Sequence, residues 1–205
     1  ARFGDFATPG WGTIKSSENY ERRFVMTFPN ETLPKGRRQK ATALYDHLTK
    51  KGAVWAQDFG LENALWFANS PENAYEDPTF HRSRAHKYVE REVKTVRENV
   101  GGIEIANYAK HEFKGPGARD LLDYILAGKI PNPGRINLSP MLTSKGKLYG
   151  DLTVACIEDE YFILFGSGLM QEAHRRWFEN KLPEKGVTYL NRSDDYHGVA
   201  ISGPK

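Results

Sequence analysis

The sequence predicts an α+β fold in which helices flank an antiparallel sheet. Three consecutive strand patterns, at residues 136–142, 148–157 and 161–165, are separated only by short turns and form a meander. The helical patterns do not alternate regularly with strands, as they would in a parallel, doubly wound sheet. Hairpin strands mixed with helices therefore favour an antiparallel sheet.

The composition is that of a globular protein with no bias toward membranes or nucleic acids. Of the 205 residues, 39% are hydrophobic and 27% charged, and the net charge is +3. No apolar run approaches the roughly 20 residues of a membrane helix, and no basic stripe is long enough to follow a nucleic-acid backbone. We therefore expect no membrane and no nucleic-acid partner. The sequence has a single cysteine, Cys156, which excludes an intrachain disulfide and favours a reducing compartment. Cys156 stands in an apolar stretch, so we predict that it is a buried strand residue.

The composition shifts near residue 80. The earlier part is rich in glycine, proline and aromatic residues, which predicts loops, short strands and one helix, at residues 38–51, that ends at Gly52. From residue 80 the periodicity predicts a helix at 82–100, strands near 103–105 and 111–113, and a helix closed by Gly128. After the meander come a helix at 169–180 and strands at 187–190 and 198–201. The face of the 169–180 helix predicted to be buried consists of Leu169, Met170, Ala173 and Trp177.

Few residues stand in a pattern that indicates chemistry. The six histidines lack metal-binding spacing and Cys156 has no cysteine partner, so no metal site is predicted. Gly166-Ser167-Gly168 follows a strand and opens a helix, as a dinucleotide-binding loop does, but Gln171 replaces the third glycine. A tight strand-to-helix turn is the favoured interpretation.

Asp151 is the carboxylate of most interest. It stands at a strand start after Gly150, where the absence of a side chain lets a ligand approach the backbone closely. An isolated aspartate is more often a turn or capping residue. From the residues alone, both interpretations of Asp151 remain.

Four blocks of the second part resemble the aminomethyltransferase module of the glycine-cleavage T-protein, in the form fused to dimethylglycine and sarcosine dehydrogenases. The blocks are YVEREV (88–93), FKGPGA (113–118), NLSPMLTSKGKLYGDLTV (137–154), and GSG (166–168) with HRRWF (174–178). The resemblance implies two regions: residues 1–79 would be the region connecting to a flavin-dependent dehydrogenase half, and residues 80–205 the N-terminal part of a T-protein-like folate-binding domain. The chain stops close behind a strand pattern, so we expect an incomplete domain that is inactive alone.

The function implied by this resemblance is one-carbon transfer. An upstream half carrying FAD would oxidise a small N-methylated amine, of the dimethylglycine or sarcosine kind. The folate half would capture the iminium or formaldehyde carbon on tetrahydrofolate as 5,10-methylene-tetrahydrofolate. The expected compartment is the bacterial cytoplasm or the mitochondrial matrix. The alternative is a non-catalytic regulatory or binding protein on the same fold.

The resemblance also assigns site residues. Asp151 occupies the position of the family's catalytic carboxylate, which orients the reacting folate nitrogens and stabilises developing positive charge. The predicted cofactor-binding residues are Tyr108, Met141, Leu142, Phe165 and Ser167. Where the family usually has Gly-Trp-Glu-Arg-Pro, residues 60–64 read Gly-Leu-Glu-Asn-Ala, which leaves the amine substrate undefined.

Overall fold

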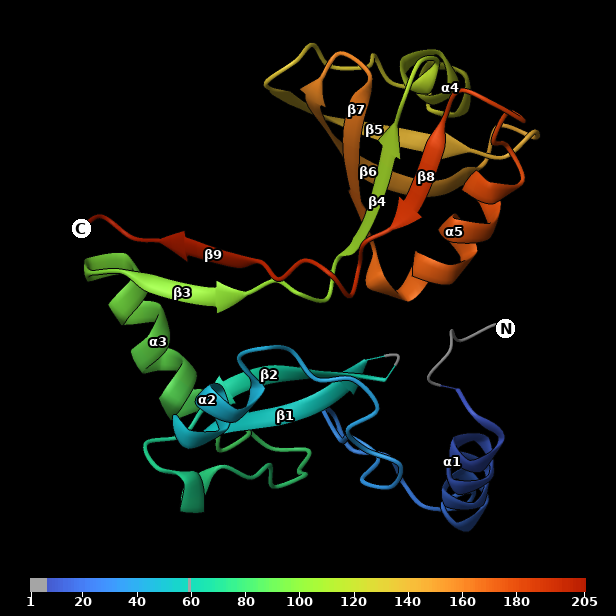
Figure 1. Cartoon of the computed structure of the whole chain (residues 1–205). Helices are drawn as coiled ribbons and strands as arrows, with labels where there is room; N and C mark the ends of the chain where they lie inside the picture. Colours follow the sequence, from blue (N-terminus) through green and yellow to red (C-terminus); the bar gives the residue numbers. More distant parts are fainter. Residues whose placement is uncertain (1–6, 59) are drawn as a thin grey trace. The chain divides into compact units, whose positions relative to one another are not determined.

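The computed structural model describes residues 7–58 and 60–205; the first six residues of the predicted connecting region, and residue 59, lie outside the described part. The chain folds into two compact units (Figure 1). Unit 1 contains the described residues up to Ile105 together with His197–Lys205, and unit 2 is Ala106–Tyr196. The predicted boundary between residues 79 and 80 separates the connecting region from the folate-binding domain, and does not refer to compact units. This boundary stays a prediction.

Unit 2 is built on a five-stranded sheet with strand order β5-β6-β7-β4-β8. Every neighbouring pair of strands in it is antiparallel. The strands are β4 (Ala109–Lys114), β5 (Arg135–Leu142), β6 (Leu148–Glu158), β7 (Tyr161–Gly166) and β8 (Thr188–Asn191). This arrangement confirms the predicted α+β class, and β5, β6 and β7 are the predicted meander.

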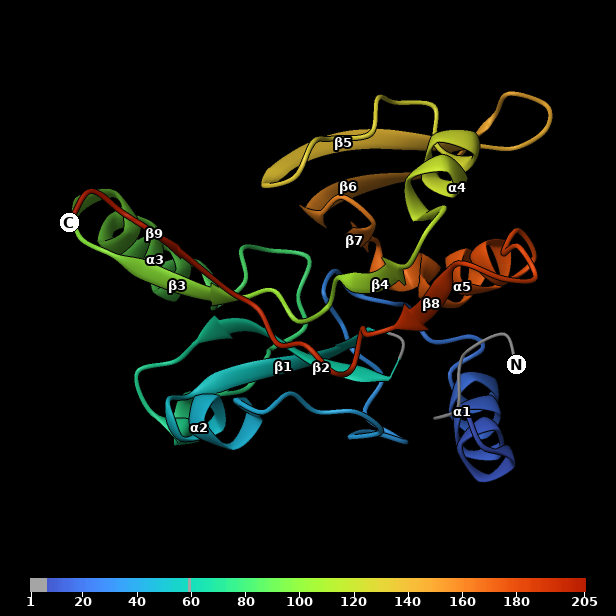
Figure 2. The same ribbon diagram turned by 45° about the horizontal axis from the view of Figure 1, so that its top comes forward.

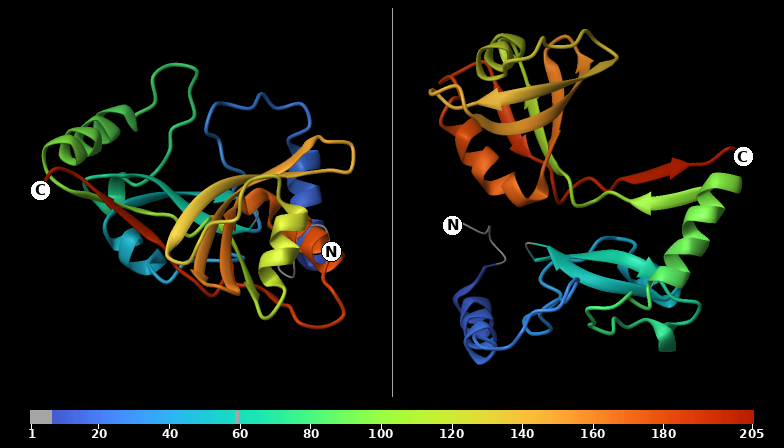
Figure 3. Two further views of the ribbon diagram at one scale, coloured as in Figure 1. Left: turned by 90° about the horizontal axis from the view of Figure 1, so that it is seen from above. Right: turned by 180° about the vertical axis from the view of Figure 1, so that it is seen from behind.

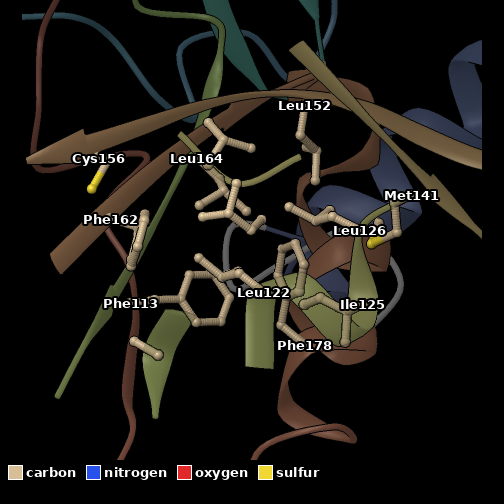
Figure 4. Close-up of a cluster of buried hydrophobic side chains, with 13 residues drawn as sticks. Phe113, Leu122, Ile125, Leu126, Met141, Leu152, Cys156, Phe162, Leu164 and Phe178 are labelled. Carbon is tan, nitrogen blue, oxygen red and sulfur yellow. The ribbon is translucent and has the colours of Figure 1, made fainter. Parts of the chain in front are cut away.

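Helices α4 (Ala118–Ile125) and α5 (Gln171–Glu179) complete the core of unit 2. Helix α5 runs beside β4 and β8 (Figure 2). Because side chains alternate along a strand, every second residue of the sheet points toward these helices. Figure 4 shows the resulting cluster. Its fully buried members are Phe113, Ala118, Leu122, Met141, Leu152, Val154, Phe162, Leu164 and Phe178. Cys156, only 2% exposed, packs among them as predicted.

Unit 1 holds the remaining elements. They are α1 (Pro9–Glu21), α2 (Tyr45–Lys50), β1 (Ala53–Asp58), β2 (Leu61–Phe67), η1 (Pro71–Asn73), α3 (His86–Glu98), β3 (Gly101–Glu104) and β9 (Val199–Ser202). Strands β1 and β2 form an antiparallel pair, and β3 pairs with the distant β9 (Figure 3). Helix α3 packs on β2, where the rings of Tyr88 and Trp66 stack with centroids 4.9 Å apart. Among the described residues, no helix combines the length and apolar character needed to cross a bilayer.

Two buried carboxylates tie the irregular segments of unit 1 to its regular elements. Glu62 on β2 is 1% exposed and accepts hydrogen bonds from Arg37 Nε (2.8 Å), from Arg37 Nη2 and from the Arg38 backbone N–H (3.0 Å). The hydrogen bond to Glu62 is the main reason that the pKa of Arg37 is raised. Glu18 on α1, also 1% exposed, accepts from Lys15 Nζ (2.9 Å) and from the Lys35 backbone N–H (2.6 Å). Arg37, outside the helices and strands, therefore supplies the counter-charge of Glu62, whereas Glu18 is paired with Lys15 of its own helix and is joined to the following segment by the Lys35 N–H.

The predicted helix at residues 38–51 is wrong in its first half, because the observed helix α2 is only Tyr45–Lys50. Arg38 has a left-handed backbone conformation (φ 59°), and its N–H is used by Glu62. Lys40 forms an isolated bridge with Leu61. These contacts with β2 override the local helical propensity. Helix α1 was not predicted, so the first part holds more than one helix.

The buried face predicted for the helix at 169–180 is wrong in its first turn, whereas Trp177 does pack against the core. Leu169 and Met170 lie in the short 3-10 helix η2 (Gly168–Met170), and Leu169 is 56% exposed. Since the α-helix begins only at Gln171, its core-facing stripe is carried by His174 and Phe178 instead.

Candidate functional site

All six predicted site residues lie at one end of the sheet of unit 2, which we call the Asp151 end. On β5 and β6 the end is marked by the pairs Pro140–Asp151, Met141–Gly150 and Leu142–Leu148. On β4 and β7 it is marked by the pair Ala109–Gly166, which Tyr108 precedes and Ser167 follows. At this end the pairing of β6 with β7 stops at Thr153–Phe165. Asp151 therefore lies beyond the last pair, at the end of the sheet where Ser167 follows β7.

Asp151 lies on the face of the sheet that does not point into the helix-covered core. Its neighbours Leu152 and Val154 are fully buried in the core, so Asp151 and Thr153 point the opposite way. The register places Leu138, Ile136 and Phe165 on this same outer face. Leu138 is 69% and Ile136 64% exposed. Asp151 itself is exposed, and among the residues that the structure describes its carboxylate has no hydrogen bond or ion pair. On this face the unpaired carboxylate thus lies near the exposed Leu138 and the half-buried Phe165, whereas Ile136, which pairs with Ala155, lies farther from it.

The predicted cofactor-binding residues are not equally accessible. Tyr108 is 50% exposed, Ser167 is exposed and makes no side-chain capping bond, and Phe165 is half-buried. Leu142 is half-buried and lies next to a register shift in β5. Met141 is fully buried and points into the core (Figure 4). By strand alternation it lies on the opposite side of the sheet from Asp151. A ligand on the outer face would reach Tyr108, Phe165 and Ser167 directly, and Met141 would support such a site from behind. Leu142 pairs with Leu148 beyond the register shift, so strand alternation does not assign it to the outer face.

Lys110 is a residue of this site that sequence analysis missed. It pairs with Phe165, is only 3% exposed, and donates from Nζ to the carbonyl oxygens of Tyr108 (2.7 Å) and Ala106 (3.0 Å). Burial lowers its pKa, against a smaller raising effect from Asp194. Lys110 therefore fixes the segment that carries Tyr108. A lone lysine within a strand pattern gives no sequence signal for such a role.

Two buried histidines lie behind the Asp151 end. His111 on β4 and His174 on α5 have ring centroids 6.2 Å apart, and they are 0% and 1% exposed. His111 Nδ1 lies 2.9 Å from the Tyr189 hydroxyl, while its Nε2 has no hydrogen-bond partner in the described part of the chain. Burial, and secondarily the charge of His174, lowers the pKa of His111 to about 3. Burial also lowers the pKa of His174, while the Tyr149 carbonyl and the Asp151 carboxylate oppose that shift.

Acid is expected to destabilise unit 2 through His111. The unfolded chain binds this proton near pH 6.5 but the folded chain only near pH 3, so the stabilisation is present above pH 6.5 and is lost as the pH falls between these values. Each pH unit in the window corresponds to about 1.4 kcal/mol. His111→Gln, which keeps a polar group for Tyr189, should reduce the loss of unfolding free energy between about pH 7 and pH 4 by roughly 3 kcal/mol. Urea unfolding of the parent chain and of the variant at both pH values measures this loss of unfolding free energy.

The control for this experiment is His86→Gln, at an exposed position on α3. Its pH dependence should follow that of the parent chain. If His111→Gln also followed the parent, proton uptake by His111 would not contribute to acid unfolding.

The charged groups that line the cavity described in unit 1 already have partners. This cavity of about 390 Å³ includes Lys15, Glu31, Gln57 and Asp58 among its lining residues, and none of the predicted site residues. Lys15 pairs with Glu18, and Glu31 pairs with Arg22. The Asp151 end remains the stronger candidate site.

Comparison with known proteins defines the class of domain. The sequence profile of the GCVT N-terminal domain matches residues 44–205, and the chain belongs to this family. It is 31% identical over 208 residues to dimethylglycine dehydrogenase of Mus musculus, covering 99% of this chain and 24% of that protein. It is 32% identical over 116 residues to an aminomethyltransferase of Chloroherpeton thalassium, covering 56% of this chain and 32% of that protein. The chain thus spans about a quarter to a third of these relatives.

The fold has a close structural counterpart. The glycine cleavage system aminomethyltransferase T of Bartonella henselae aligns with a TM-score of 0.66 and 18% identity, over 81% of this chain and 41% of that protein. The predicted relationship to the T-protein module is confirmed at the level of family and fold. The roles of the individual site residues remain predictions.

Proposed function

We propose that the Asp151 end of the sheet binds tetrahydrofolate, and that the chain is part of a module that transfers a one-carbon unit to it as 5,10-methylene-tetrahydrofolate. The observation that carries the proposal is the unpaired carboxylate of Asp151 on an exposed apolar strand end. It stands in a domain of the GCVT N-terminal family. Ligand sites commonly combine an apolar wall with a few polar groups that fix orientation, and this end of the sheet has both.

The residues present fit such a ligand. Tetrahydrofolate supplies the nitrogen atoms that carry the one-carbon unit, on a flat ring system with apolar faces. Phe165 and the half-exposed Tyr108 offer aromatic surface for those faces. Asp151 offers a charged acceptor that can orient N–H groups and stabilise positive charge as it develops during transfer. The Ser167 hydroxyl adds one donor and acceptor.

The proposed source of the carbon is a small N-methylated amine, such as dimethylglycine or sarcosine. We propose that a flavin-dependent dehydrogenase part carrying FAD oxidises the amine and that the present module receives the carbon. Similarity to dimethylglycine dehydrogenase along 99% of the chain supports this partnership. No residue of this chain is assigned to the amine.

Asp151→Asn is expected to weaken the binding of 5-formyl-tetrahydrofolate about tenfold to a hundredfold, because hydrogen bonds to a charged acceptor contribute about 1.5–3 kcal/mol. Isothermal titration calorimetry on both chains measures the change. The matched control is Asp159→Asn in the turn between β6 and β7, where the carboxylate is 83% exposed and pairs with Arg119. Equal affinity for the parent and Asp151→Asn would remove the proposed role of Asp151. Absence of folate binding by the parent would favour a non-catalytic domain on this fold.

A further inference from the structure

A second residue at the Asp151 end has a geometry suited to acting through the backbone. We propose that His174 is a positioning residue for Asp151, whose ring holds strand β6 in place just before the carboxylate. The proposal rests on the proposed function in so far as Asp151 is the ligand-binding group. The strand pairing of the sheet is locally weak around Asp151.

Strand β6 has little ladder support around Asp151. Its pairing with β7 starts only at Thr153, so residues 148–152 pair with β5 alone. Opposite Asp151 on β5 stands Pro140, which has no N–H to donate to the ladder. The register of β5 then shifts between Met141 and Leu142. Strand pairing therefore assigns Asp151 to the outer face but holds this stretch of β6 from one side only, next to an irregular strand end.

His174 supports the strand at this point from α5. Its Nε2 lies 3.3 Å from the Tyr149 carbonyl oxygen. A carbonyl only accepts, so Nε2 carries the proton and donates it to this bond. The ring can lie this close because residue 150 is glycine: a Cβ there would be 2.6 Å from Nε2. At Gly166, at the end of β7, the close neighbour is Leu152 instead: a Cβ there would be 2.6 Å from Leu152 Cδ2 but at an ordinary contact distance, 3.5 Å, from His174 Nδ1.

The electrostatics suit a positioning group. Because burial lowers its pKa, the His174 imidazole is neutral at pH 7. A neutral imidazole donates to Tyr149 without forming an ion pair with the nearby Asp151. The Asp151 carboxylate therefore keeps its charge available to a ligand.

Two substitutions separate positioning from simple packing. His174→Phe keeps a ring against Tyr149 and Phe178 but loses the donor, whereas His174→Gln keeps an N–H donor and loses the ring contacts. If His174 positions Asp151, the phenylalanine variant should bind 5-formyl-tetrahydrofolate about 3- to 10-fold more weakly, the effect of one lost hydrogen bond. The glutamine variant should stay within about twofold of the parent despite the greater loss of unfolding free energy.

Amide hydrogen exchange at residues 149–152 gives a second readout that needs no ligand. Exchange there should accelerate in His174→Phe and remain near the parent rate in His174→Gln. Gly150→Ala tests the same contact from the strand side, because its Cβ would displace the ring, and should resemble His174→Phe in both readouts.

The proposal is overturned if affinity follows stability, so that glutamine is worse than phenylalanine, or if both variants bind like the parent. Failure of the proposed function has a different signature, since Asp151→Asn would then leave affinity unchanged. In that case the exchange rates decide: equal rates in the phenylalanine and glutamine variants would make His174 a packing residue only.

Discussion

Phe178→Ala is expected to destabilise unit 2 by about 3–5 kcal/mol, the usual cost of truncating a buried phenylalanine. The Phe178 side chain on α5 is fully buried. Its ring centroid lies 5.1 Å from that of Phe113, 5.0 Å from His111 and 5.7 Å from Tyr189. These neighbours belong to the paired strands β4 and β8, so the sheet cannot easily collapse into the cavity left by the substitution. Urea unfolding measures the loss.

The control for Phe178 is Tyr124→Ala on α4, whose side chain is 75% exposed. That change should stay within about 0.5 kcal/mol of the parent. Hydrogen exchange locates the effect: protection in Phe178→Ala should fall first among residues 106–196. A cost below about 1 kcal/mol would contradict the close packing of α5 on this sheet.

Arg37→Leu is expected to destabilise unit 1 by about 3–5 kcal/mol, because removing one partner of a buried ion pair leaves the other charge without compensation. Glu62 is 1% exposed, and Arg37 donates to both of its carboxylate oxygens. Of the donors in the described part of the chain, only the Arg38 backbone N–H would then remain for that carboxylate. Urea unfolding with hydrogen exchange on β1 and β2 measures the loss and its location.

Lys35→Met provides the matched control for Arg37. Lys35 pairs with Glu21 at the surface, where the two side chains are 49% and 57% exposed. Exposed pairs contribute about 0–1 kcal/mol, so this variant should remain close to the parent. Equal costs for Arg37→Leu and Lys35→Met would show that Glu62 is not held by a buried ion pair.

The sequence predicted unit 2 better than unit 1 because unit 2 depends on local patterns. Strands β5, β6 and β7 have clear apolar alternation and tight turns, and all three were predicted. In unit 1, the segment before Tyr45 is shaped by distant contacts, above all the bonds from Arg37 and Arg38 to Glu62. Such contacts leave no local pattern. Helix α1 did carry readable start signals, since Thr8 caps it and Pro9 follows.

The candidate site shows a similar division. Asp151 stood out because Gly150 precedes it in a recognisable motif, and the register brings the other five predicted residues to the same end of the sheet. The burial of Met141 could not be foreseen, because the face of β5 it occupies depends on pairing. Lys110 and His174 were missed as site residues because their contacts arise only when β4 and α5 pack.

The central claim is that folate binds at the Asp151 end of the sheet. The most direct measurement follows the backbone amide signals of the labelled chain by NMR during titration with 5-formyl-tetrahydrofolate. We predict saturable shifts centred on Asp151, Thr153, Phe165 and Ser167, and much weaker saturation in Asp151→Asn. Saturable shifts confined to residues of unit 1, or shifts in Asp151→Asn that match the parent, would contradict the claim.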